Sequence, residues 1–257
     1  MRNAFGAIGL RTNRHGEKGA CGMSSFAAKS REERLNAFYD SEEFISAQQY
    51  NLLLCGAVLW GVLINFILCV TVGNVYRYMN PLPFFIGYTV LLIAGLLISA
   101  KSHNPVISFI GYNMVVVPMG LVISTCVELY GGVQSEIVAE AFLITLCVTA
   151  AMTFFAVTKP ELCEKMGGVL LPCLLGLIIA EIIMLLIGYQ NILTAWIGAI
   201  LFSLYIAYDV YRSQKFAKTA DNAIDCAVDI YMDLANLFLR ILRILANSKG
   251  GSRGRRY

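Results

Sequence analysis

Long blocks of apolar residues, separated by short polar segments, dominate the pattern of this chain. Six blocks stand out, at residues 52–72, 82–100, 106–127, 137–157, 166–188 and 192–211. Read as a helix with a rise of about 1.5 Å per residue, each block can cross the ~30 Å hydrocarbon core of a bilayer. None of the blocks alternates as a membrane strand does, and a helix satisfies its own backbone polar groups in lipid. The pattern therefore predicts an all-α membrane protein.

A seventh segment, residues 223–246, has helical spacing but is more polar than the other six. Asp225, Asp229 and Asp233 follow one another at intervals of four residues, so they stack along one side of a helix. A full crossing would place the basic C-terminal residues outside, whereas a re-entrant segment would keep them inside. Because residues 231–245 are long and largely apolar, we expect seven full membrane helices.

Polar segments flank the membrane domain, which the pattern places at residues 50–247. Residues 1–49 are basic and begin with a stretch rich in Gly, Ser and Ala, so we expect an N-terminal segment that is partly disordered. Residues 248–257 (SKGGSRGRRY) are basic and rich in Gly, and we expect a disordered tail. Both segments lie outside the bilayer in this interpretation.

The distribution of charge agrees with a membrane location and predicts an orientation. Charged residues are 14% of the chain and hydrophobic residues 58%, whereas soluble domains carry about a quarter charged residues. If the N-terminus is cytoplasmic, the loops on that side contain Lys101, Lys159, Lys165, Arg212, Lys215 and Lys218. The loops between the first six helices on the other side contain only Arg77. The positive-inside rule therefore predicts a cytoplasmic N-terminus.

The residues that most enzymes need are scarce. The chain has two histidines, His15 and His103, too few for a zinc hydrolase that uses several histidines or for a Ser–His dyad inside a helix. It also contains no Gly-x-Ser-x-Gly sequence. We therefore expect neither an enzyme nor a bound cofactor.

Acidic residues inside the apolar segments are the candidates for chemistry. These are Glu140, Glu181, Asp209, Asp229 and Asp233, and no lysine or arginine lies deep in the first six blocks to pair with them. An ionised side chain in the bilayer is costly and usually marks a pathway or a proton relay. Buried carboxyl groups take up protons or share one between them. This pattern favours a pH-sensitive cation path and excludes an anion channel.

Several of these acidic residues also fit plainer roles. Asp225 and Asp229 can lie in the solvated first turns of the seventh helix, where the helix dipole favours acidic side chains. Glu140 lies near the outer end of its block and can sit at the level of the lipid headgroups, and a packing hydrogen bond would satisfy Glu181. Counting along the helices places Asp209 at a depth close to that of Asp229, so depth alone favours Asp229 as its partner.

Three stretches of the chain resemble the Bax inhibitor family, also called the transmembrane Bax inhibitor motif family. They are FSLYIAYD at residues 202–209, DIYMDLANLFLRILRIL at residues 229–245 and AEAF at residues 139–142. The resemblance extends over about residues 49–247. It implies a seven-helix fold in which the polar last helix lies in the middle of the other six. It also implies a pH-sensitive calcium leak channel, with Ca²⁺ as the permeant ion.

The resemblance also implies the site. The acidic pair of the family, matched by motif, corresponds to Asp209 and to Asp233, which replaces Asp229 as the expected partner. The two carboxyl groups would sense pH, gate the path and bind Ca²⁺ transiently. Where the family has an arginine near the inner end of the second helix, this chain has Lys101 as a possible basic latch. Lysine lacks the planar fork of a guanidinium group, so such a latch would be weaker.

A second function stays open on the sequence alone. The protein could be a non-conducting membrane regulator of a stress response or of a membrane protease, binding its protein partner through residues 1–49 and the loops. In both functions the bilayer is the immediate environment, and nothing in the sequence indicates nucleic-acid binding. The short loops and basic N-terminal segment favour a bacterial inner membrane over the endoplasmic reticulum.

Overall fold

The computed structural model describes residues 44–74, 80–188 and 191–253. Within these ranges the chain forms seven helices, and its only β-type pairing is an isolated bridge between Phe44 and Thr219. The helices are α2 (Ala47–Thr71), α3 (Pro81–Lys101), α4 (Pro105–Leu129), α5 (Glu136–Thr158), α6 (Pro160–Ile187), α7 (Leu193–Lys215) and α8 (Ala220–Arg253). By length and composition, six of them, α2 to α7, can cross a membrane. The prediction of an all-α membrane protein is confirmed in this part of the chain.

The observed helices extend beyond several of the predicted ranges, most of all in two cases. The helix predicted at residues 166–188 begins at Pro160, because its charged first turns (PELCEK) interrupt the apolar pattern without interrupting the helix. The helix predicted at residues 223–246 runs from Ala220 to Arg253 as one continuous element, so part of the expected tail, residues 248–253, is helical. Of the predicted N-terminal segment, residues 1–49, the first 43 lie outside the described residues.

Capping side chains and prolines fix where several helices begin. The Ser46 hydroxyl accepts a hydrogen bond from the Gln49 amide at 3.2 Å, and the Gln49 side chain accepts one from the Ser46 amide at 3.0 Å. This reciprocal pair is a capping box at the start of α2. The Asn104 side chain accepts from the Val106 amide at 2.9 Å at the start of α4. Helices α3, α4 and α6 each begin at a proline, which suits the first turn of a helix.

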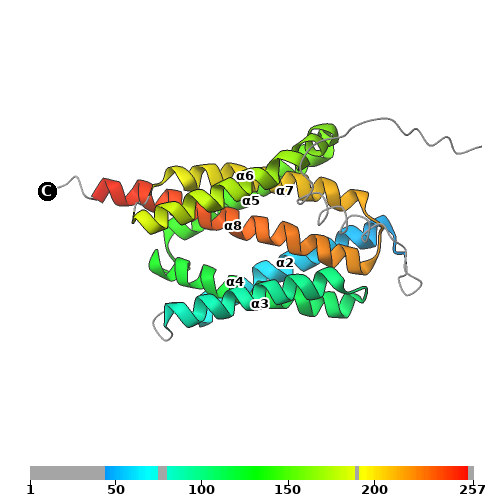
Figure 1. Cartoon of the computed structure of the whole chain (residues 1–257), viewed down its shortest axis with the longest axis horizontal. Helices are drawn as coiled ribbons and strands as arrows, with labels where there is room; N and C mark the ends of the chain where they lie inside the picture. The colour runs from blue at the N-terminus through cyan, green and yellow to red at the C-terminus, as the bar shows by residue number, and fades with distance from the viewer. Residues whose placement is uncertain (1–43, 75–79, 189–190, 254–257) are drawn as a thin grey trace, which may run out of the picture. The chain divides into compact units, whose positions relative to one another are not determined.

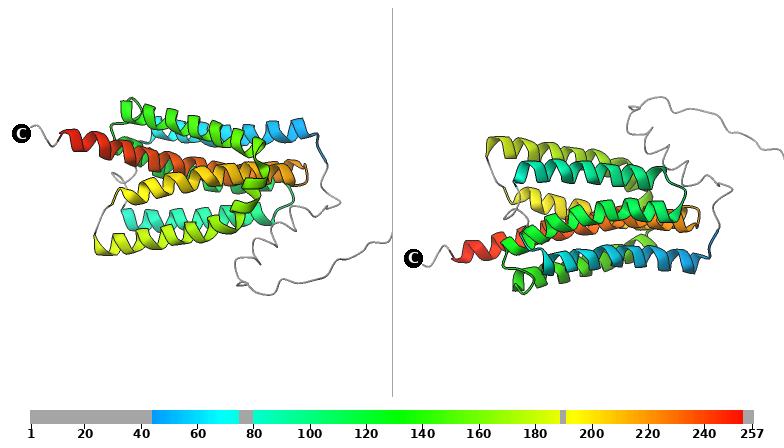
Figure 2. Two further views of the ribbon diagram at one scale, coloured as in Figure 1. Left: turned by 90° about the horizontal axis from the view of Figure 1, so that it is seen from above. Right: turned by 90° about the horizontal axis from the view of Figure 1, so that it is seen from below.

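Helix α8 joins two groups of three helices. It packs against α2 and α4 on one side and against α5 and α7 on the other, while α3 packs on α4 and α6 packs on α7. Figure 1 shows α8 between the two groups, and both views in Figure 2 show it running lengthwise among the other helices. We call the end of the bundle where α8 begins the proximal end, and the end where α8 finishes the distal end.

Two buried tyrosines form the centre of the contact between α2, α4 and α8. The rings of Tyr112 and Tyr231 meet edge to face with their centroids 5.6 Å apart. The Tyr112 hydroxyl donates to the Ala57 carbonyl at 2.8 Å, and the Tyr231 hydroxyl donates to Asn65 Oδ1 at 3.0 Å. A side chain at Gly61 would overlap both tyrosines. The glycine therefore lets α2 approach the tyrosines closely enough for these bonds.

Candidate functional site

Asp209 of α7 and Asp233 of α8 lie side by side within the bundle. Their carboxyl groups interact directly, and only 8% of the Asp233 surface is exposed. Asp233 Oδ2 is buried without a hydrogen-bond partner among the described residues. Tyr205, one turn before Asp209 on α7, lies close to both carboxyl groups. The contact between α7 and α8 therefore contains a pair of acidic groups rather than an acid and a base.

Asp229 lies one turn from Asp233, on the proximal side. It is partly buried and close enough for its charge to act on Asp233. Asp209 contacts Asp233, the partner that the family motif implies. Asp229 instead extends the acidic surface from the pair toward the proximal end.

The first turns of α8 hold two more buried carboxylates. Asp225 is 2% exposed and accepts a short hydrogen bond from the Ser99 hydroxyl of α3. Asp221 is 3% exposed and accepts one from the Ser108 hydroxyl of α4 at 2.6 Å. The solvated position considered for Asp225 is therefore wrong, because the end of α3 and the start of α4 contact the first turns of α8. Neither serine was a candidate in the sequence.

Four aspartates thus follow α8 from the proximal end to the pair. They are Asp221, Asp225, Asp229 and Asp233, spaced four residues apart. At 1.5 Å per residue they extend over about 18 Å of the helix axis. Beyond Asp233 the buried residues of α8 are apolar, among them Leu237, Phe238 and Leu242. The acidic surface therefore covers only the proximal half of the helix.

Glu181 of α6 has a basic partner from α8. The Arg240 guanidinium group donates to both carboxylate oxygens, with Nη2 to Oε2 at 2.9 Å. The two side chains are 17% and 29% exposed, so water screens the pair only in part. A side chain at Gly198 would overlap the Arg240 side chain. The glycine in α7 therefore leaves the space through which Arg240 reaches α6.

Glu140 lies at the distal end and is also paired. Lys249 of α8 donates to its carboxylate at 2.8 Å, and both side chains are more than two-fifths exposed. Arg243 donates to the Asn191 carbonyl at 3.4 Å nearby. Glu140 and Glu181 were candidates for an ion path, but the structure holds both in ion pairs on the distal half of α8. The sequence did not indicate their partners.

Lys101 is exposed at the last turn of α3. Among the described residues, no ion pair joins it to Asp209 or Asp233. A different lysine is fixed at the proximal end: Lys218 donates to the Ser213 and Gln214 carbonyls at 3.1 and 2.9 Å and lies 4.2 Å from the Tyr50 ring centroid. Burial lowers the pKa of Lys218 below its ordinary value.

The donor set of the aspartate pair suits a passing cation more than a resident one. Within the described ranges, no group of three or more His, Cys, Asp or Glu side chains is arranged to hold a metal ion. Ca²⁺ takes about six to eight oxygen ligands, and two carboxylates supply only part of that number. An ion at the pair would therefore keep part of its water shell.

Comparison with known sequences gives a consistent result. Residues 43–250 match the family model described as "Inhibitor of apoptosis-promoting Bax1". The chain is 29% identical to Bax inhibitor 1 of Schizosaccharomyces pombe over 167 residues, 64% of this chain and 60% of the relative. It is 26% identical to inner membrane protein YbhL of Escherichia coli over 141 residues, 51% of this chain and 59% of the relative.

A third relative is an uncharacterised protein of Helicobacter pylori, 35% identical over 108 residues, 41% of this chain and 46% of the relative. The chain thus spans about half the length of the curated relatives that it matches. The relatives include bacterial and eukaryotic proteins, and the matched region contains the whole described helical bundle apart from its last residues.

Proposed function

We propose that this chain, which belongs to the Bax inhibitor family, is a pH-sensitive leak pathway for calcium ions across its membrane. The observation that carries the proposal is the direct contact between the Asp209 and Asp233 carboxyl groups across α7 and α8. Two carboxyl groups in contact inside a bundle cannot both ionise without strong repulsion. The contact is therefore stable only while the pair holds a proton.

The shared proton gives the pair its role as a gate. With the proton present, one carboxyl group donates to the other and holds α7 against α8. As pH rises the proton is lost, and two like charges a few ångströms apart repel each other. The helices separate, and the exposed carboxylates form a negative site for a cation that prefers oxygen ligands. Flux is accordingly expected to increase with pH.

The other acidic residues of α8 provide the approach to this gate. Asp221, Asp225 and Asp229 lead from the proximal end to Asp233. Carboxylates along a narrow path attract cations and exclude anions. The buried residues in the distal half of α8, which are apolar and include Leu237 and Leu242, then form the barrier that the separation of α7 and α8 has to open.

The same proposal includes the orientation of the chain. Helix α8 has 34 residues, about 51 Å at 1.5 Å per residue, which is long enough to make a seventh crossing. The connections at the proximal end contain Lys101, Lys159 and Lys218. We place this end and the N-terminus in the cytoplasm, following the positive-inside rule.

Calcium uptake into liposomes that contain the purified protein tests the function. Wild-type uptake should increase from about pH 5 to about pH 8, the range in which folded proteins are generally most stable. Asp209→Asn and Asp233→Asn should each lose most of this pH dependence. In either variant only one carboxyl group remains at the pair, so two like charges cannot form there. Glu161→Gln, an exposed acidic residue in the first turn of α6, is the matched control and should behave as wild type.

Two results would end the proposal. One is uptake by both asparagine variants that equals wild type at every pH. The other is wild-type uptake no greater than that of empty liposomes throughout the pH range. The second result would favour the non-conducting regulator, whose partner contacts would lie in the N-terminal segment and loops.

A further inference from the structure

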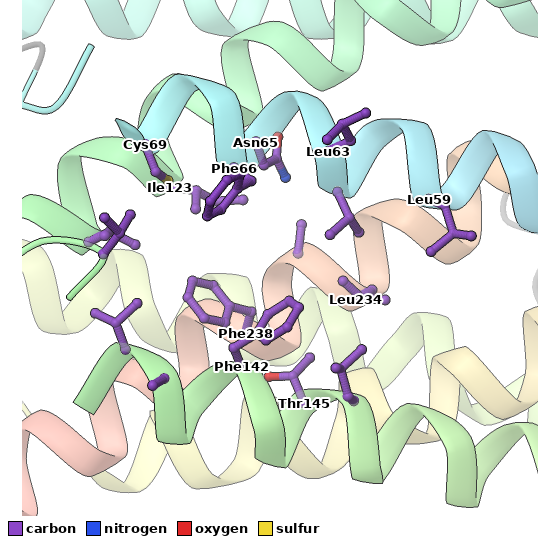
Figure 3. A pocket seen from close by; sticks show the side chains of 17 residues that line it. Leu59, Leu63, Asn65, Phe66, Cys69, Ile123, Phe142, Thr145, Leu234 and Phe238 are labelled. Atoms are coloured by element: carbon purple, nitrogen blue, oxygen red, sulfur yellow. The ribbon is translucent and has the colours of Figure 1, made fainter. Parts of the chain in front are cut away.

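A deep groove separates the two helix groups on the side where α2 faces α5. Its volume is about 510 Å³. Helices α2 and α5 form its walls and α8 its floor, as Figure 3 shows with Leu63 and Phe66 on one side, Thr145 on the other and Leu234 and Phe238 on α8. The groove exists because α8, rather than a direct contact between α2 and α5, joins these parts of the bundle.

The lining of the groove is apolar. None of its 17 residues is an Asp, Glu, Lys, Arg or His. Its few polar groups include Asn65, whose Oδ1 accepts from Tyr231, and Thr145, whose hydroxyl donates to the Ala141 carbonyl at 2.7 Å. These bonds turn the polar atoms toward the protein. The groove therefore has few polar groups that could bind an ion or a chain of water molecules, and an apolar ligand fits its lining better.

The groove is continuous with the surface that faces lipid. On its rims, Leu59 is 67% exposed, Phe66 60% and Phe142 44%. These side chains belong to membrane-spanning helices, whose exposed apolar surfaces contact acyl chains. No charged residue separates them from the groove lining, so the groove is open to the acyl chains of a surrounding bilayer.

The dimensions of the groove agree with a lipid chain from one leaflet. Its wall on α2 runs from Leu59 to Cys69, about 15 Å along the helix axis at 1.5 Å per residue. This is about half of the ~30 Å hydrocarbon thickness. The wall on α5 starts at Val138, close to the beginning of that helix, so the groove lies in the distal half of the bundle.

We propose that the groove binds one acyl chain of a bilayer phospholipid, taken from the leaflet at the distal end. The chain fills the gap between α2 and α5 and lies on Leu234, Ala235 and Phe238 of α8. Inside a bilayer the gain comes from dispersion contacts that an unfilled gap would forfeit, since lipid and protein are equally apolar. The proposal depends on the membrane location of the bundle and not on calcium conduction.

Photocrosslinking in vesicles tests the proposal on the unmodified protein. The vesicles consist of phosphatidylcholine with a small fraction of a phosphatidylcholine that carries a photoreactive group in its acyl chain. Crosslinks should be enriched on residues 59–69 and 138–146 relative to the exposed face of α6 around Ile179 and Leu185. We expect an enrichment of about tenfold, equivalent to a preference of about 1.4 kcal/mol.

A pair of variants on α5 provides the second readout. Ala139→Trp places an indole ring in the groove, whereas Ala150→Trp places one on an exposed part of the same helix outside it. Ala139→Trp should reduce groove crosslinks to the level of α6, and Ala150→Trp should leave them unchanged. Crosslinks spread evenly over all exposed apolar faces of the wild type would overturn the proposal, whatever either variant does. So would unchanged groove crosslinks in a folded Ala139→Trp protein.

Discussion

Arg240 lies seven residues beyond Asp233 on α8 and neutralises Glu181, an acidic residue far from the aspartate pair. At the pair of Asp209 and Asp233, by contrast, one carboxyl group lies against another. The two acidic positions therefore have neighbours of opposite charge type. Glu181 lies beside a guanidinium group that is always charged, whereas two carboxyl groups in contact repel each other when both are ionised.

This difference predicts the effect of removing the arginine. Arg240→Met leaves the Glu181 carboxylate partly buried without its donor, and should reduce the free energy of unfolding by about 2–3 kcal/mol. Arg240→Met combined with Glu181→Met should recover most of that loss, since no uncompensated charge remains. The midpoint of thermal unfolding in detergent micelles measures both changes.

Lys215→Met is the matched control for this experiment. It breaks the ion pair between Lys215 and Glu164. Both side chains of this pair are more than half exposed, and the Lys215 nitrogen lies 3.4 Å from the Glu164 oxygen. An exposed pair of this kind contributes about 0–1 kcal/mol, so the midpoint should hardly change. Equal losses in Arg240→Met and Lys215→Met would show that the buried position of Arg240 has no special importance.

At the scale of the element, the start of α8 is fixed to the first helix group by two hydrogen bonds. Ser99 of α3 and Ser108 of α4 each donate to a buried carboxylate of α8. Because both serines lie at the proximal end, the first turns of α8 should move together with α3 and α4. Helix α7 has no part in these two bonds and can separate from α8 while they remain.

Ser99→Ala tests this attachment. The substitution leaves the buried Asp225 carboxylate without its hydroxyl donor, and should cost about 1–3 kcal/mol. We expect faster hydrogen exchange of backbone amides in the first turns of α8, near residues 220–228, with little change near residues 235–245. Ser102→Ala, where the hydroxyl bonds only locally to Asn104, should leave exchange in α8 unchanged. Uniform protection of α8 in Ser99→Ala would contradict the attachment.

The six apolar helices were predictable because about 20 consecutive apolar residues have few structures open to them in a bilayer. The boundaries were less predictable where charge enters a helix, as in the first turns of α6. The extent of α8 was underestimated for the same reason, since Lys249 is charged yet helical. Hydropathy reports the environment of a residue and only indirectly its backbone conformation.

The candidate site was predictable where two helices are consecutive. Asp209 and Asp233 lie on α7 and α8, which a short connection joins. Counting residues along these helices favoured Asp229 as the partner of Asp209, and only the resemblance to the family selected Asp233. The partner of Asp225 is 126 residues away in the chain, and the partner of Glu181 is 59 residues away. Nothing local in the sequence indicates which faces of α3, α6 and α8 meet, so those contacts required the structure.

For the molecule as a whole, α8 makes the main contact between the two helix groups. At the proximal end α2 also meets α7 directly, where the Tyr50 hydroxyl donates to the Ser213 carbonyl at 2.9 Å. The serine bonds tie α8 to α3 and α4, and the aspartate pair ties it to α7. Loss of the shared proton should therefore separate one helix group from the other rather than move a single side chain. A lipid chain between α2 and α5 would accommodate such a separation, because it replaces a rigid contact between the groups.

The distance between the two groups at different pH tests the central claim most directly. Spin labels at Lys101, at the end of α3, and Lys215, at the end of α7, report it in a background without the native cysteines; both positions are exposed. In vesicles the label distance should increase by several ångströms from about pH 5 to about pH 8. The Asp209→Asn and Asp233→Asn double variant should keep the short distance throughout. A wild-type distance that is the same at both pH values would contradict the account.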